Sequence, residues 1–534
     1  MELFDKGTIH QILVKPVKLF GHPSIKDKIE AISKYRSFAD TSDIKYVYPL
    51  IFSKNRELAI IAADTVAEIM RKVQDRHWNT VYDEVKYTKI DLGDMDIILN
   101  YPRNTSIHLL GIASLNCNGF VREKALRLIN DSGNSCSIPY IILRLSDWVP
   151  SVRILAEQMI EKTLTRDYID IFIDNFYLIN KLQNVIRVDL LKIRQRIVDF
   201  LKNYSFRNII MSRLKHSQVK VRLFCYSLLT ERISYDEDII NCALKDKSFE
   251  VRIWLVNAIK TVEYDKRIIV IRKLLNDKSA KVIIAILRNY EEIVCREYRE
   301  RLKELVIDQH VSVRDEARFI TKKHSLIEDF REFYKQQLDI NTVYGALMGL
   351  GETGEKGDFE YIRDYFNSEE PKIKLASMTA MWYLSKDEGI SYVLKSLDSD
   401  IPKIKKTAKK IVINSKMPIV LYEMKEKLKS NNTEIRLLAL DVIWGYGGWN
   451  ALEGILFAIS KWQSPEIAKA ISLLGRWLIR ATSLYTKPDN TTYYKISEYF
   501  EFVKRGKLIS DEAIKELAFI FETRGLKTIP IDIF

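Results

Sequence analysis

The chain has 534 residues, of which 47% are hydrophobic and 29% charged, and its formal net charge is +13. This hydrophobic content is typical of a folded protein and excludes a wholly disordered one. There are only 12 prolines and 19 glycines, no Gly/Ser-rich or Pro-rich linker, and every long apolar run is interrupted by charge. We therefore expect a basic, nearly all-helical protein with no membrane-spanning segment.

The N-terminal sequence and the cysteines indicate a reducing compartment. Residues 1–20 contain acidic side chains early and lack a small-residue cleavage site, so we expect no secretory signal peptide. The cysteines are odd in number and scattered, which favours buried free thiols over disulfides or a zinc site. They are Cys117, Cys136, Cys225, Cys242 and Cys295. We expect a cytoplasmic protein.

An apolar residue followed by a basic one recurs along the chain about every 31 residues. The steps from Val221 to Val251 and from Ile373 to Ile404 are 30 and 31 residues. In chain order the pairs are Val121-Arg122, Val152-Arg153, Ile186-Arg187, Val221-Arg222, Val251-Arg252, Val313-Arg314, Ile373-Lys374, Ile404-Lys405 and Ile435-Arg436. Val282, Val343 and Ile467 continue the period without the basic residue. A fixed period of this length indicates stacked supersecondary units rather than one globular core.

Each unit has the pattern of two helices. In residues 236–260, apolar residues share one helical face over 239–244, a polar break follows at 245–248, and helical spacing resumes from Val251. The same pattern occurs in 266–290, 297–321, 388–413 and 418–443. We call the Val or Ile of each pair position zero; it and position +7 are apolar in nearly every unit. The sequence thus predicts an all-α solenoid of stacked helix pairs.

The period also suggests how the chain is organised. We expect an N-terminal cap (1–24), irregular N-terminal repeats with an insertion (25–104), a regular solenoid (105–480), and a loop with a C-terminal helical cap (481–534). Residues 71–104 and 161–185 interrupt the period, and such insertions are either part of a functional face or irregular connections. The apolar tail, residues 529–534, either packs on the last helices or acts as a short docking strand.

The units resemble HEAT repeats, in particular the short bacterial kind found in phycobilin-lyase-like proteins. An Asp stands five residues before position zero at Asp147, Asp246, Asp277 and Asp308, and in three of these units Val-Arg then opens the second helix. Residues 350–354, Leu-Gly-Glu-Thr-Gly, match the ending of a second helix in that family. The resemblance covers about 105–480 well and 25–70 more weakly. It implies that second helices line a concave face, and that the repeated Arg and Asp form a structural ladder.

The charge is concentrated, and this suggests a binding surface. Residues 181–232 carry 12 basic and three acidic side chains, and residues 401–430 carry nine and two. Positions −1 and +6 should face outward from the second helices, but Glu250, Glu434 and Asp441 share them. The predicted partner-binding residues are Arg127, Lys192, Lys220, Lys281, Arg288, Lys372, Lys403, Lys406 and Lys410. We expect a non-enzymatic scaffold for a protein partner; the alternative is a nucleic-acid-binding solenoid.

Enzymatic motifs are absent from the sequence. It contains no phosphate-binding loop, His-Glu-x-x-His, Cys-x-x-Cys or nucleophile elbow, and we expect no catalytic residue, cofactor or metal. Asp441, Trp444 and Arg436 resemble the residues that alkylpurine DNA glycosylases with HEAT-like repeats place in a basic groove, but Trp444 is more readily interpreted as a core residue. Activity on a tetrapyrrole, as in phycobilin lyases, is a more distant analogy. The sequence leaves the partner and the oligomeric state open.

Overall fold

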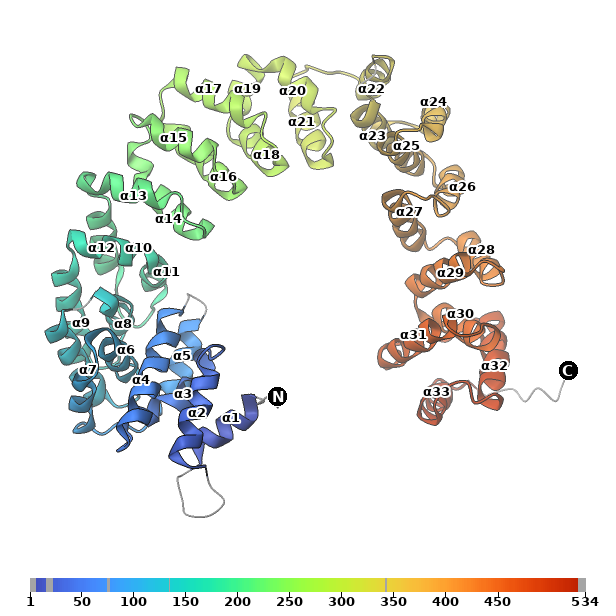
Figure 1. Cartoon of the computed structure of the whole chain (residues 1–534). Helices are drawn as coiled ribbons and strands as arrows, with labels where there is room; N and C mark the ends of the chain where they lie inside the picture. The colour runs from blue at the N-terminus through green and yellow to red at the C-terminus, as the bar shows by residue number, and fades with distance from the viewer. Residues whose placement is uncertain (1–5, 16–22, 74–76, 134, 341–342, 527–534) are drawn as a thin grey trace. The chain divides into compact units, whose positions relative to one another are not determined.

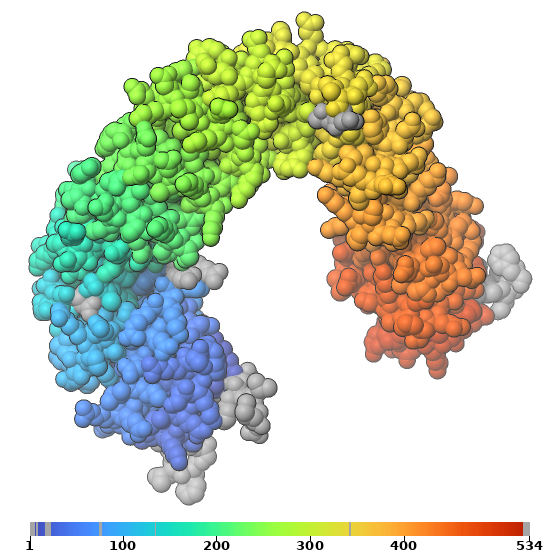
Figure 2. All heavy atoms as spheres, turned by 45° about the horizontal axis from the view of Figure 1, so that its top comes forward, coloured from blue at the N-terminus to red at the C-terminus, as the bar shows by residue number. Residues whose placement is uncertain are grey.

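The computed structural model describes residues 6–15, 23–73, 77–133, 135–340 and 343–526, and over these ranges it contains helices and no strand (Figure 1). The chain divides into two compact units, Met1–Tyr290 (unit 1) and Glu291–Phe534 (unit 2), shown as atoms in Figure 2. Within the described ranges, no helix combines the length and the apolarity that crossing a bilayer requires. The apolar tail at 529–534 lies outside the described residues.

Unit 1 begins with short helices and becomes regular toward its end. Its α-helices are α1 (Lys6–Val14), α2 (Ile25–Tyr35), α3 (Ile44–Val47), α4 (Arg56–Arg71), α5 (Trp78–Val85), α6 (Arg103–Ala113), α7 (Gly119–Ser132), α8 (Ile138–Arg144), α9 (Pro150–Thr163), α10 (Ile169–Asp174), α11 (Phe176–Lys181), α12 (Leu191–Leu201), α13 (Arg207–Arg213), α14 (Val219–Leu229), α15 (Glu237–Leu244), α16 (Phe249–Ala258), α17 (Tyr264–Leu274) and α18 (Ala280–Asn289).

Unit 2 continues with helix pairs up to α33. Its α-helices are α19 (Glu291–Glu297), α20 (Arg299–Leu305), α21 (Val311–Lys323), α22 (Phe330–Asp339), α23 (Val343–Thr353), α24 (Phe359–Arg363), α25 (Pro371–Leu384), α26 (Lys386–Ser396), α27 (Pro402–Ser415), α28 (Pro418–Lys427), α29 (Thr433–Tyr446), α30 (Gly448–Lys461), α31 (Glu466–Ala481), α32 (Asn490–Arg505) and α33 (Asp511–Thr523).

The predicted helix pairs are confirmed. Residues 236–260 form α15 and α16, and the break between them caps the second helix, since the Ser248 hydroxyl accepts a hydrogen bond from the amide of Glu250 at 3.1 Å. Second helices pack on second helices: α14 lies against α16 and α16 against α18 in unit 1, and α23 against α25 and α27 against α29 in unit 2 (Figure 1). The chain is therefore an all-α helical-repeat protein built from HEAT-like pairs.

Position zero forms the core of the stacks. At eight repeats its side chain is buried, including Val282, which lacks a basic neighbour. The eight are Val121, Val152, Val221, Val251, Val282, Val313, Ile373 and Ile404. Val343, Ile435 and Ile467 are only half-buried. Apolar burial at this spacing is the main contribution to the stability of each pair.

One predicted position zero is wrong. Ile186 is fully exposed and lies in the connection before α12, which begins at Leu191. The following Arg187 stacks on the ring of Trp148, with its guanidinium carbon 3.3 Å from the ring centroid. The pair Ile186-Arg187 therefore does not open a second helix, and the repeat between α9 and α14 is irregular.

The repeated arginines form the structural ladder that the resemblance implies. The Arg252 guanidinium donates to the Asp277 carboxylate from Nε at 2.6 Å and from Nη2 at 3.0 Å, and Nη1 donates to the Asp246 carbonyl at 2.7 Å. Asp277 in turn accepts from the amide of Ser279 at 2.8 Å, so it orders the turn before the next helix. The same bidentate geometry joins Arg122 to Asp147 and Arg222 to Asp246. Each repeat of this region is thus tied to the turn of the next.

In unit 2 a glutamate replaces the ladder aspartate. Arg314, which is buried, pairs with Glu352 on α23, and Arg436 pairs with Glu466 on α31. Glu352 also accepts a hydrogen bond from Arg318 at 2.7 Å.

Helix α23 packs closely on its neighbours at two glycines. A Cβ atom at Gly345 would lie 1.7 Å from the carbonyl oxygen of Ile307, and one at Gly351 would lie 2.6 Å from the Cα of Ala380. Glycine is therefore required at both positions, and residues 350–354 end the second helix as predicted, with the Gly354 amide donating to the Leu350 carbonyl at 2.7 Å.

The cysteines are less buried than predicted. Cys225 and Cys295 are buried, whereas Cys117 and Cys242 are exposed and Cys136 is half-buried. All five are free thiols.

Candidate binding sites

All nine predicted partner-binding cations are exposed and lie on second helices or on α12. Arg127 is on α7, Lys192 on α12, Lys220 on α14, Lys281 and Arg288 on α18, Lys372 on α25, and Lys403, Lys406 and Lys410 on α27. Five belong to unit 1 and four to unit 2. The structure fixes each group only within its own unit, so a single groove that uses both remains a prediction.

The nine cations differ in what they contact. Arg127 pairs with Glu123 on its own helix at 2.6 Å. Lys281 lies over the ring of Phe249 and Lys372 over the ring of Tyr344, both at 4.6 Å from the ring centroid. Among the residues that the structure describes, five have neither an ion-pair partner nor a ring contact: Lys192, Lys220, Lys403, Lys406 and Lys410. The register assigned to Lys192 was wrong, because it was counted from Ile186, which lies outside the helix.

Helix α27 presents the densest group of free cations. Its core side is formed by Ile404, Ala408 and Val412, which are buried. Lys403, Lys406 and Lys410 are spaced by three and four residues, so they share another side of the same helix. Their ammonium groups are therefore available to an external anion.

The residues that resemble a glycosylase site are held by structural contacts. Asp441 pairs with Lys409 and Lys469, both at 2.7 Å. Burial raises the pKa of Asp441, but the two lysines outweigh it and hold that pKa below its ordinary value. Arg480 lies over the Trp444 ring at 5.0 Å, and Arg436 is used by Glu466. Trp444 is half-buried rather than part of the core.

One group in unit 2 has metal-ligand chemistry. The ligand atoms of Glu291, Glu292 and His324 lie within 4.8 Å of one another. Glu291 already accepts from His324 Nε2 at 2.7 Å and pairs with Lys323 at 2.8 Å, which lowers its pKa. An ammonium group at this distance competes with a bound cation, so the contacts within the protein account for the group.

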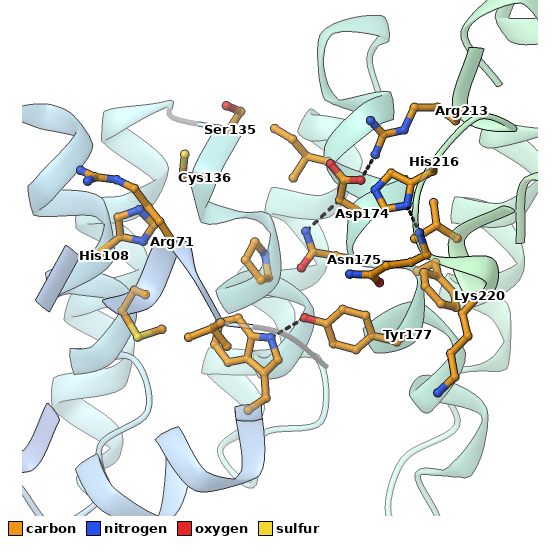
Figure 3. Close-up of a pocket in the computed structure, with 18 of the residues that line it drawn as sticks. Arg71, His108, Ser135, Cys136, Asp174, Asn175, Tyr177, Arg213, His216 and Lys220 are labelled. Carbon is orange, nitrogen blue, oxygen red and sulfur yellow. Dashed lines mark hydrogen bonds and ion pairs between the residues drawn. The ribbon is translucent and has the colours of Figure 1, made fainter. Parts of the chain in front are cut away.

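The two insertions meet at a cavity of about 1010 Å³ in unit 1 (Figure 3). The first insertion contributes α5, and the second contributes α10 and α11. The remaining walls are formed by helix α6, the ends of α4 and α13, the start of α14, and the turn at Ser135–Ser137. This volume lies just above the range of about 300–1000 Å³ that is usual for small-molecule sites.

Aromatic contacts join the two insertions across this cavity. The indole Nε1 of Trp78, on α5, donates a hydrogen bond to the hydroxyl of Tyr177, on α11, at 2.5 Å (Figure 3). Trp78 also packs edge-on against Tyr140 with centroids 5.5 Å apart, and Phe176 stacks on Phe224 at 5.3 Å. These contacts hold the walls in place, so the cavity is built into unit 1.

The polar lining contains a neutral histidine and several charges. His108 is buried, and its Nδ1 lies 3.0 Å from the Tyr140 hydroxyl. Burial and, secondarily, the charge of Arg71 lower the pKa of His108 to about 4, so the imidazole is neutral at pH 7. Asp174 forms an ion pair with Arg213 (Figure 3). Arg71 and Lys220 are exposed and have no carboxylate partner among the residues that the structure describes.

Sequence reasoning identified the insertions but not the cavity. Lys220 is the one predicted site residue that lines it. The other lining residues come from segments between Met70 and Val221 that have no common motif, and only the stacking of helices brings them together. The aromatic run at 168–177 was the available signal, because it departs from the repeat pattern.

No family model matches this chain. A comparison with curated proteins finds no match. Similar solved structures include a Kap121p mutant, which is 11% identical over 96% of this chain and 58% of that chain, with a TM-score of 0.29. Kap95p, in a structure with RanGDP, is 11% identical over 97% of this chain and 65% of that chain, with a TM-score of 0.27. Another is the complex of CpcE and CpcF of phycocyanin lyase from Nostoc, which is 13% identical over 51% of this chain and 94% of that chain, with a TM-score of 0.19. This chain thus spans 58% of the length of that Kap121p chain, and the fold assignment rests on the helix pairs and the ladder.

Proposed function

We propose that this protein is a binding scaffold that takes an acidic protein segment on the outward lysines of its second helices. The observation that carries the proposal is the side of α27 that holds Lys403, Lys406 and Lys410. These side chains are exposed and have no ion-pair partner in the described part of the chain, whereas the ladder arginines Arg122, Arg222 and Arg252 are neutralised by aspartates. Three uncompensated cations on one helix attract an anionic surface and steer its approach.

A protein segment is favoured over nucleic acid by the state of the aromatic rings. Single-stranded nucleic acid binding generally needs exposed rings on which bases stack between the cations. Phe249 and Tyr344, the rings beside predicted cations, are half-buried and already have a lysine over one face. The lysines of α27 are spaced by Thr407 and Ala408 rather than by aromatic residues.

The test compares two triple charge reversals of the full chain. In the first, Lys403, Lys406 and Lys410 are each changed to Glu; in the matched control, the exposed Lys386, Lys395 and Lys515 are each changed to Glu. Both variants change the net charge equally. Each protein, and the wild type, is used in a pull-down with mass spectrometry and in filter binding with RNA and DNA at about 50 and 150 mM salt.

We expect a protein partner that the wild type and the control retain and the α27 variant loses, with no nucleic acid retained at about 150 mM salt. Salt-sensitive nucleic-acid binding that is lost only in the α27 variant would instead assign these lysines to phosphate contacts. Equal capture by all three proteins would exclude this side of α27 as a binding surface.

A further inference from the structure

We propose that the cavity between the two insertions of unit 1 binds a small organic anion through carboxylate or phosphate groups. This inference is independent of the α27 lysines, which lie in unit 2. It rests on the charge of the lining, on an unused polar atom and on walls that are already fixed.

The charge of the lining is uncompensated. Arg71, Arg213 and Lys220 line the cavity, and Asp174 is the one carboxylate among its lining residues. Because Asp174 is paired with Arg213, the positive charges of Arg71 and Lys220 remain. They come from the end of α4 and the start of α14. An anion in the cavity would neutralise charge that no described carboxylate neutralises.

The neutral His108 adds a polar contact without adding charge. Its Nδ1 is used by the Tyr140 hydroxyl, whereas Nε2 has no hydrogen-bond partner among the described residues. His108 is buried against Tyr140 and lines the cavity on the side of Arg71 (Figure 3). Nε2 is not one of the enclosed polar atoms that lack a partner, so it is open to the cavity, and a ligand there can form a hydrogen bond with it.

The walls are suited to an organic molecule rather than a single ion. The volume of about 1010 Å³ far exceeds that of one inorganic anion, and Trp78, Phe176 and Tyr177 provide apolar surface. Because the hydrogen bond from Trp78 to Tyr177 and the Asp174–Arg213 ion pair fix these walls, little ordering is needed when the ligand binds.

The experiment measures binding of two probes, citrate and inorganic pyrophosphate, to the full chain by isothermal titration calorimetry at about 50 mM salt. The variants are Arg71→Ala and Lys220→Ala, and the control is Lys192→Ala, an exposed lysine that does not line the cavity. All three replaced side chains are exposed, so the variants should fold; circular dichroism verifies this.

We expect at least one probe to bind the wild type and the control equally, with Kd raised about tenfold or more in each cavity variant. Binding of citrate alone would identify carboxylates as the recognised groups, and binding of pyrophosphate alone would identify phosphates. The proposal is overturned if neither probe binds at concentrations up to about 10 mM, or if Arg71→Ala and Lys220→Ala bind as tightly as the wild type.

Discussion

In unit 1 three arginines that directly follow position zero, Arg122, Arg222 and Arg252, pair with the aspartate of the next turn, whereas in part of unit 2 the same place is occupied by Lys374 and Lys405. The difference extends to the acceptor. Where the arginine is present at 222 and 252, the next turn carries Asp246 and Asp277; after Lys374 and Lys405 the equivalent residues are Ser399 and Ser430. Both partners of the buried ion pair are therefore replaced together, the arginine by lysine and the aspartate by serine. Lys374 and Lys405 are half-buried and are not held by a turn aspartate.

The comparison shows that position zero and its neighbour have separate roles. Position zero is buried at eight repeats across the two units and supports the stack, while a basic residue at position +1 either forms an ion pair, as Arg252 does, or has no ion-pair partner among the described residues, as in Lys405. This explains why the basic residues of the repeat cannot be assigned to one function from the sequence alone.

The largest effect should come from charging position zero in either unit. We expect Val251→Asp and Ile404→Asp each to destabilise the surrounding repeats by more than about 4 kcal/mol, because an unpaired carboxylate would be buried at a side chain that has no exposure. Amide hydrogen exchange of α16 and α27 measures this. Lys403→Asp, an exposed neighbour, is the control and should have little effect; comparable losses would contradict the register.

A smaller effect separates the two units at position +1. Arg252→Ala should destabilise unit 1 by about 3–5 kcal/mol, because it leaves the largely buried Asp277 without its partner. Lys405→Ala should cost less than about 1 kcal/mol, because no ion pair is broken. Local hydrogen exchange again provides the measurement, and equal losses at the two positions would show that the ladder does not stabilise unit 1.

The buried histidine of unit 1 should make stability depend on pH. The pKa of His108 falls from 6.5 to about 4 on folding, so the unfolded chain binds more protons between these values. Stability is therefore fully present above about pH 6.5 and is lost as the pH falls toward 4, by at most about 3 kcal/mol. The free energy of unfolding is measured by thermal unfolding of the wild type and of His108→Gln at each pH, and the difference between the two proteins isolates this contribution from that of the carboxylates. A difference that does not change with pH would contradict a neutral, buried imidazole.

The smallest effect tests whether the ladder can be transferred. The double variant Lys405→Arg with Ser430→Asp should reproduce the unit 1 geometry, since Arg436 already donates to the Ser430 carbonyl at 2.9 Å, as Arg252 does to that of Asp246. A double-mutant cycle should give a favourable coupling of about 1 kcal/mol. No coupling would mean that the turn at 430 differs in shape from the turn at 246.

The helix pairs could be predicted from the sequence because their cause is local. Position zero, the polar turn and the Asp before it lie within ten residues, and where all three occur, as at Val251 and Val313, the predicted helices are found. Ile186 failed because the pair stood alone: the residue five before it is Lys181, and no capping turn precedes it. An apolar-basic pair is common by chance, and in the regular repeats it opens a second helix after a polar turn residue, such as Asp246 before Val251 or Ser399 before Ile404.

The cavity could not be predicted because its cause is not local. Trp78 and Tyr177 are 99 residues apart, and neither belongs to a motif. Their contact depends on how two irregular insertions pack on α8, which no period describes. The free lysines of α27 were recognisable as a cluster, but whether such lysines are paired depends on neighbouring helices, as Lys409 and Asp441 show.

The ladder also has a consequence for how such an array can be inherited. A module that carries arginine at position +1 depends on the module that follows it for the matching aspartate. Duplicating or deleting one whole module between Val221 and Val282 would leave every donor with an acceptor, so the array can change length there without loss. If a repeat from unit 2 with serine in its turn and lysine at position +1 were inserted after Arg222, the guanidinium of Arg222 would have no aspartate to pair with. The order of modules, and not only their number, is thus constrained by the chemistry of adjacent turns.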